Sequence, residues 1–141
     1  MNKVNIHATC IDYQGTGILI IGPSGSGKSD LALRLIMNKN AKLVADDRTD
    51  IWNQNGKLAA ACPNAILGQM EVRGIGICAF PPCPQTEIKL VVNLLLPPQK
   101  PERLPVAETA CLCGINIPQI SLNGLEASAP DKVILACYQS K

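Results

Sequence analysis

Residues 17–29 read GILIIGPSGSGKS, an apolar run followed by the pattern G-x-x-x-x-G-K-S from Gly22 to Ser29. The apolar run is typical of a buried strand, and leucines and isoleucine recur at helical spacing after Ser29. A strand, a glycine-rich turn and a helix in this order form a loop that binds phosphate groups. The glycines let backbone N–H groups turn inward, and the helix N-terminus favours negative charge. The stretch therefore predicts an α/β fold with a phosphate-binding loop.

The loop also predicts which groups contact the phosphates and a metal ion. Lys28 can reach the β- and γ-phosphates, and the Ser29 hydroxyl can bind Mg²⁺. The candidate nucleotide-binding residues are Gly22, Pro23, Ser24, Gly25, Ser26, Gly27, Lys28 and Ser29.

The sequence before the loop predicts a β-hairpin that leads into it. Residues 4–11 alternate between apolar and polar, and a turn at residues 13–15 separates them from the apolar strand at 17–21. Residue numbers across such a hairpin add to about 28, which places His7 near Ile21 and the loop.

Further elements follow from spacing and turn residues. In the first half we expect a helix at residues 28–38, a strand at 42–45, and a hairpin of 49–53 with 57–61 around Asn55-Gly56. A bent strand at 72–80 and a buried strand at 88–96 follow, and then a polar loop at 97–105. Residues 106–130 are expected to be irregular except for a short strand at 119–122, and a helix is expected at 131–139. No repeat or linker interrupts this order, so residues 1–141 are expected to form a single domain.

Composition excludes several classes of protein. The chain has 141 residues, of which 47% are hydrophobic and 3% aromatic, and its formal net charge is +2. Few aromatic residues and a small charge argue against nucleic-acid binding. No apolar run is long enough for a membrane span or a signal peptide, so a cytoplasmic protein is expected. The seven cysteines include no Cys-x-x-Cys, and His7 is the single histidine. Reduced thiols are therefore expected rather than a zinc site or disulfides.

Two adjacent carboxylates follow the strand predicted at residues 42–45. Asp46 and Asp47 end this strand, and the carboxyl end of a strand in an open α/β sheet faces the ligand crevice. One aspartate could accept a hydroxyl proton while the other holds a metal ion through water. The alternative is an ion pair with Arg48 or an ordinary turn.

A second charged cluster is Glu71-Val72-Arg73, whose outer members share one face of a strand. Glu71 could complete the ligands of Mg²⁺, and Arg73 could neutralise a phosphate during its transfer. The alternative is a pair of exposed side chains without a chemical role. Arg103 lies in a loop, and its position alone indicates little.

In their order along the chain, these pieces resemble one known family. A histidine precedes G-x-x-x-x-G-K-S, followed by LVADDR from residue 43, EVRGIGI from 71 and ERL from 102. This order resembles the catalytic domain of HPr kinase/phosphorylase. The resemblance implies a phosphoenolpyruvate-carboxykinase-like α/β fold with a mixed sheet. By this resemblance the catalytic residues are His7, Lys28, Asp46, Arg73 and Arg103, with Asp46 as proton acceptor, and the Mg²⁺ ligands are Ser29 and Glu71.

The resemblance also implies an activity and partners. A member would use ATP and Mg²⁺ to phosphorylate a serine of the phosphocarrier protein HPr, and would assemble as a hexamer. It would also catalyse the reverse, phosphorylase reaction, for which the family uses a basic loop near residues 120–132. Here only Lys132 is basic in that stretch. The chain looks like the short form of the family found in alphaproteobacteria, with six residues before His7.

Three other functions remain open from the residues. A small-molecule kinase usually needs an arginine-rich lid, and residues 97–105 contain one arginine. A GTPase-like switch would need Asn-Lys-x-Asp, whereas residues 38–41 read NKNA. A regulatory module that binds a nucleotide without transferring phosphate would have the same loop.

Overall fold

The computed structural model describes residues 2–63 and 67–139. Its elements, in chain order, are β1 (Val4–His7), β2 (Thr9–Tyr13), β3 (Thr16–Ile21), α1 (Lys28–Lys39), β4 (Lys42–Ala45), β5 (Arg48–Gln54), β6 (Lys57–Ala61), β7 (Gln69–Val72), β8 (Gly76–Ala79), β9 (Gln85–Leu94), β10 (Glu108–Leu112), β11 (Ile115–Leu122) and α2 (Ala129–Gln139).

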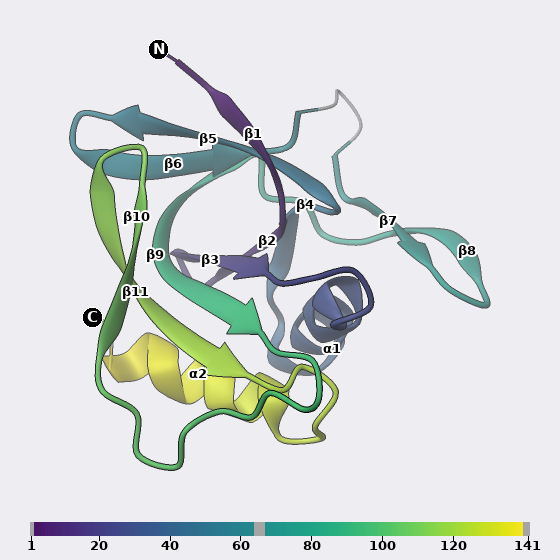
Figure 1. Ribbon diagram of the computed structural model, residues 1–141. Coiled ribbons are helices and arrows are strands. Elements are labelled where there is room, and N and C mark those ends of the chain that lie inside the picture. The colour runs from purple at the N-terminus through teal and green to yellow at the C-terminus, as the bar shows by residue number, and fades with distance from the viewer. Residues whose placement is uncertain (1, 64–66, 140–141) are drawn as a thin grey trace.

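A large mixed sheet organises the chain (Figure 1). Its strands follow the order β1-β5-β6-β9-β3-β2-β4, and β11 pairs with β9 and with β10. The β3–β9 and β9–β11 pairs are parallel, and the other pairs of this sheet are antiparallel. Because β2 is antiparallel to both β3 and β4, the carboxyl ends of β3 and β4 reach the same edge. The phosphate loop and Asp46-Asp47 leave the sheet at that edge.

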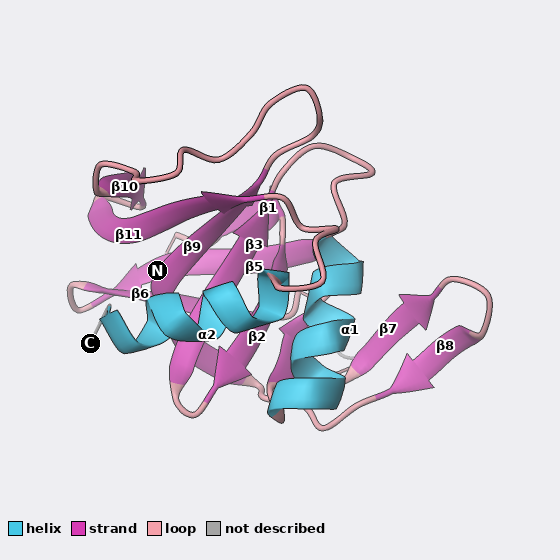
Figure 2. Cartoon of the chain, turned by 90° about the horizontal axis from the view of Figure 1, so that it is seen from below, coloured by secondary structure: helices cyan, strands magenta, loops and turns pink. Residues whose placement is uncertain are grey.

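The sheet curls, so its central strands bury side chains on both faces. Ile18 and Ile20 of β3 pack against α1 and α2, which cover one face (Figure 2). Leu19, between them, packs with Ile51 and Leu58 of the β5–β6 hairpin on the other face. Burial on both faces explains why residues 18–21 are apolar without alternation.

Several predicted elements are confirmed. The hairpin that leads into the phosphate loop is β2–β3, the helix after the loop is α1, and β4 has the predicted bounds. The hairpin around Asn55-Gly56 is β5–β6, the buried strand of the second half is β9, and the terminal helix is α2. The mixed α/β sheet is therefore as expected.

The predicted continuous strand at residues 4–11 is wrong. The chain bends at Ala8, so that β1 pairs with β5 while β2 pairs with β3. Ala8 N donates to Asp47 O (3.0 Å), and the Thr49 hydroxyl donates to Ala8 O (2.9 Å). His7 consequently lies opposite Arg48 rather than Ile21.

Two further predictions are wrong because the chain turns back on itself where no turn is predicted. Residues 72–80 do not form one bent strand, because the chain turns after β7 and returns as β8 in a two-stranded hairpin that projects from the body (Figure 1). Residues 106–130 are not mostly irregular, since β10 and β11 form a hairpin around Cys113-Gly114. Both turns rely on residues with positive φ, 51° at Cys113 and 91° at Gly74.

No helix in the described part of the chain is long and apolar enough to cross a membrane.

Candidate active site

The phosphate loop joins the carboxyl end of β3 to the first turn of α1. Gly27 has φ +95° and precedes the helix, so the loop turns with a backbone that side chains other than glycine rarely adopt. A Cβ atom at Gly22 would lie 2.7 Å from Ser26 Oγ and 2.8 Å from Leu94 O. The loop therefore closes tightly on itself and leads directly into a helix N-terminus, whose positive dipole end favours an anion.

Lys28 is held inside the loop rather than extended into solvent. Its side chain is 8% exposed, and Nζ donates to Gly22 O (2.9 Å) and Pro23 O (3.1 Å). The ammonium group thus lies across the mouth of the loop. A positive charge at this point faces any phosphate that the loop holds.

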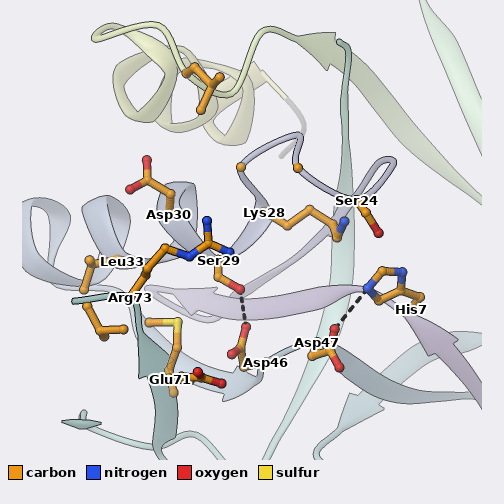
Figure 3. A pocket seen from close by; sticks show the side chains of 15 residues that line it. His7, Ser24, Lys28, Ser29, Asp30, Leu33, Asp46, Asp47, Glu71 and Arg73 are labelled. Carbon is orange, nitrogen blue, oxygen red and sulfur yellow. Dashed lines mark hydrogen bonds and ion pairs between the residues drawn. The ribbon is translucent and has the colours of Figure 1, made fainter. Parts of the chain in front are cut away.

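Asp46 lies against the phosphate loop. Its Oδ1 accepts a hydrogen bond from the Ser29 hydroxyl at 2.7 Å (Figure 3). The same oxygen accepts a second bond from the Thr9 hydroxyl at 3.3 Å. The bond to Ser29 connects the carboxyl end of β4 with the first turn of α1. Hydroxyl and carboxylate oxygens are the ligands that Mg²⁺ prefers, so this donor set fits that ion.

Asp47 faces away from Asp46 and pairs with the predicted active-site histidine. His7 Nε2 donates to Asp47 Oδ1 at 3.0 Å (Figure 3). Both side chains are accessible, 43% exposed for His7 and 72% for Asp47. The predicted alternative, an ion pair of the aspartates with Arg48, is absent from the described contacts. Asp47 adopts φ +66°, an uncommon backbone for aspartate that turns the two carboxylates in different directions.

These groups line one cleft of about 720 Å³ (Figure 3). Its lining residues are His7, Ser24, Gly25, Gly27, Lys28, Ser29, Asp30, Leu33, Asp46, Asp47, Met70, Glu71, Val72, Arg73 and Leu125. Of the predicted loop residues, Gly22, Pro23 and Ser26 do not line it. Gly22 and Pro23 instead accept the bonds from Lys28, and Ser26 is buried.

The β7–β8 hairpin brings the second charged cluster to the cleft. Glu71 belongs to β7 and Arg73 to the turn that follows, and both side chains line the cleft beside the carboxylates (Figure 3). The structure thus brings together residues separated by more than forty positions in the sequence. Arg103 is exposed on the loop between β9 and β10 and does not line the cleft of its own chain. Its catalytic role stays a prediction.

Several residues that line the cleft, and one that bonds a lining residue, were not predicted from the sequence. Thr9 is fully buried and bonds Asp46. The two-residue spacing from His7 gives no signal for it, because the chain bends at Ala8 and Thr9 belongs to β2. Leu33, Met70 and Leu125 are apolar, and nothing in their local sequence separates them from core residues. They reach the cleft only through the packing of α1, β7 and the turn after β11.

The cysteines lie outside the cleft. None of the seven forms a disulfide bond in the described structure, and within residues 2–63 and 67–139 no three His, Cys, Asp or Glu side chains gather as a metal site. Burial raises the pKa of the Cys10 thiol, and burial also raises the pKa of Cys83. Both thiols are therefore held protonated.

A phosphate loop and a carboxylate pair that leave the carboxyl ends of β3 and β4 at the same edge of the sheet are typical of domains that bind nucleotides. Comparisons with known proteins identify the family within this class. Residues 1–136 match the family model described as the HPr Serine kinase C-terminal domain. The chain therefore belongs to the HPr serine kinase C-terminal domain family, which confirms the resemblance drawn from the sequence.

Named relatives agree with this membership. An HPr kinase/phosphorylase of Lactobacillus acidophilus is 35% identical over 129 residues, covering 84% of this chain and 40% of that protein. One from Variovorax paradoxus is 44% identical over 77 residues, covering 53% of this chain and 24% of that protein. The chain thus spans less than half the length of these curated relatives.

A solved structure matches nearly the whole chain. The Hpr(Ser) kinase/phosphatase from Coxiella burnetii superposes with a TM-score of 0.82 at 28% identity, covering 96% of this chain and 95% of that one. The curled mixed sheet is therefore shared with this protein.

Proposed function

We propose that residues 1–141 form a single catalytic domain of phosphoenolpyruvate-carboxykinase-like fold, a protein-serine kinase that transfers phosphate from ATP to an HPr-type phosphocarrier. The observation that carries the proposal is the cleft itself. It joins the phosphate loop to Asp46, bonded to Ser29, and to Asp47, bonded to His7. Phosphoryl transfer needs groups that bind phosphate and a carboxylate that positions the nucleophile, and both kinds face one space.

We assign the metal site to Ser29 and Glu71, with Asp46 beside them. When bound, Mg²⁺ supplies positive charge that neutralises the phosphate oxygens. The Ser29 hydroxyl lies within 2.7 Å of Asp46 Oδ1, and Glu71 lines the same side of the cleft. Arg73, two positions after Glu71, adds a second positive charge from the protein.

Replacement of Glu71 by glutamine tests this metal assignment. We expect the Mg²⁺ concentration for half-maximal activity to rise roughly tenfold or more, because a neutral amide is a poorer ligand for a hard cation. ATP affinity should change less, since the loop and Lys28 are intact. Titration of Mg²⁺ at saturating ATP measures this, with Glu108→Gln on the exposed start of β10 as the control. An unchanged half-maximal concentration would contradict the assignment.

Proton removal from the substrate serine is assigned to Asp46. Ser29 and Thr9 occupy only its Oδ1, and no described hydrogen bond reaches Oδ2. The free oxygen can accept the serine proton as the hydroxyl attacks the γ-phosphate. His7 and Asp47, which are more exposed, stand at the entrance where a protein substrate arrives.

The direct test is incubation of the purified protein with γ-labelled ATP, Mg²⁺ and HPr. We expect label on one serine of HPr, and none on an HPr variant with that serine replaced by alanine. Release of phosphate without transfer would indicate a nucleotide-binding regulator, and transfer to a small molecule would indicate a different kinase. Incubation of phosphorylated HPr with inorganic phosphate tests the phosphorylase reaction. Light scattering tests the hexamer that the resemblance implies.

A further inference from the structure

One apolar side chain of the cleft stands apart from the others. Leu125 is 61% exposed and lines the cleft, yet it belongs to the turn between β11 and α2. A Cβ atom at Gly27 would lie 2.9 Å from Leu125 Cδ2, so this side chain packs directly on the residue of the phosphate loop that precedes α1. Phosphate groups are not stabilised by an apolar side chain. The exposed Leu125 beside the phosphate loop is therefore not explained by phosphate binding.

The turn that carries Leu125 is fixed to the phosphate loop and to α1. Arg34 of α1 donates to Gly124 O and to Glu126 O (2.9 Å for Glu126), and it pairs with Asp30 at 3.1 Å. Leu125 N donates to Asn123 Oδ1 (3.0 Å) within the turn. The position of the leucine is thus set in advance of any ligand.

Close packing fixes the turn as well. A Cβ atom at Gly124 would lie 2.7 Å from Leu94 Cδ1 and 2.9 Å from Ser26 O. The backbone of the turn therefore rests on the backbone of the phosphate loop.

Sheet order decides which end of a nucleotide meets Leu125. Across the sheet the strands run β11-β9-β3-β2-β4, and the phosphate loop leaves the central β3. Asp46 and Asp47 reach the loop from β4 on one flank, whereas Leu125 reaches it from β11 on the other. Glu71 and Arg73 belong to the first flank, because the chain returning from their hairpin bonds to the outer edge of β4 through Leu43.

The phosphate to be transferred must face the carboxylates, so the opposite end of the nucleotide faces Leu125. We propose that Leu125 is the apolar wall that contacts the nucleoside part of ATP and so determines the preference of the site for a nucleotide over a bare polyphosphate. This inference rests on the proposed function, since it assumes ATP as the phosphate donor.

The test compares ATP with inorganic tripolyphosphate, which carries the phosphates without a nucleoside. Calorimetric titration with Mg²⁺ measures both affinities for the wild type, Leu125→Ala, Leu125→Met and the control Leu104→Ala, whose leucine is exposed on the loop outside the cleft. We expect Leu125→Ala to lower ATP affinity about tenfold, the scale of losing one apolar side-chain contact. Tripolyphosphate affinity should stay unchanged, and Leu125→Met should retain most ATP affinity.

The outcomes separate the two proposals. An equal loss for ATP and tripolyphosphate would show that Leu125 supports the loop and overturn the inference. Unchanged ATP affinity in Leu125→Ala, or a wild type that binds tripolyphosphate as tightly as ATP, would overturn it too. A wild type that binds tripolyphosphate but no ATP would instead contradict the proposed kinase. Circular dichroism and thermal unfolding confirm that each variant is folded.

Discussion

Replacement of Lys28 by methionine is expected to reduce phosphoryl transfer by at least about 10³-fold and to weaken ATP binding strongly. Methionine keeps an apolar stem of similar length but removes the ammonium group. That group lies across the mouth of the loop, bonded to Gly22 O and Pro23 O. The loop's other groups are neutral, so without Lys28 no side chain of the loop places a full charge on the phosphates.

The measurement is transfer to HPr at saturating ATP together with the dissociation constant for ATP. Lys42→Met provides the matched control, because Lys42 is exposed at the start of β4 and lies outside the cleft. A folded Lys28→Met variant with undiminished turnover would contradict the role given to this residue.

Local sequence was sufficient for the centre of the fold. The strand, loop and helix from Thr16 to Lys39 depend on neighbours in the chain, namely apolar runs, glycines and helical spacing. The Asn55-Gly56 hairpin likewise follows from the positive φ that both residues adopt, 55° and 85°. These elements need no distant partner to be recognised.

The elements that were missed depend on contacts between distant segments. Nothing within residues 4–11 marks the bend at Ala8, because its hydrogen bonds come from Asp47 and Thr49. The β10–β11 hairpin turns at Cys113-Gly114, a pair with no strong turn preference, and β11 contains Pro118, which normally argues against a strand. Pro118 lies before the residues of β11 that pair with β9, so it interrupts none of those pairs.

In the site, too, the features that depend on local sequence could be predicted, and those that depend on contacts between distant segments could not. The phosphate loop and the Asp46-Asp47 pair could be predicted as separate pieces, whereas their bonds to Ser29 and His7 could not. The hairpin register that predicts His7 near the loop is wrong, because His7 lies opposite Arg48. His7 nevertheless lines the cleft, where it bonds Asp47. Leu125 could not be found at all, since it reaches the loop through the order of β11, β9 and β3 in the sheet.

Replacement of Asp46 by asparagine is expected to lower transfer by a factor of about 10²–10⁴, the usual contribution of general acid–base catalysis. Asparagine keeps the size of the side chain, and its Oδ1 can still accept the bonds from Ser29 and Thr9. What is lost is the second carboxylate oxygen, which is the proton acceptor in the proposed mechanism. ATP should still bind, and removal of a negative charge near the phosphates favours its binding.

Asp47→Asn is the partner variant that separates the two carboxylates. Asp47 bonds His7 and has no bond to the phosphate loop, so its replacement should affect the entrance of the cleft rather than proton removal. We expect a smaller loss of turnover and a larger change in the apparent affinity for HPr. Steady-state kinetics with HPr as the varied substrate measure both parameters.

Near-normal transfer in Asp46→Asn with loss in Asp47→Asn would exchange the two roles, because the His7–Asp47 pair would then act on the serine. Normal transfer in both variants would make the carboxylates structural and contradict the kinase mechanism.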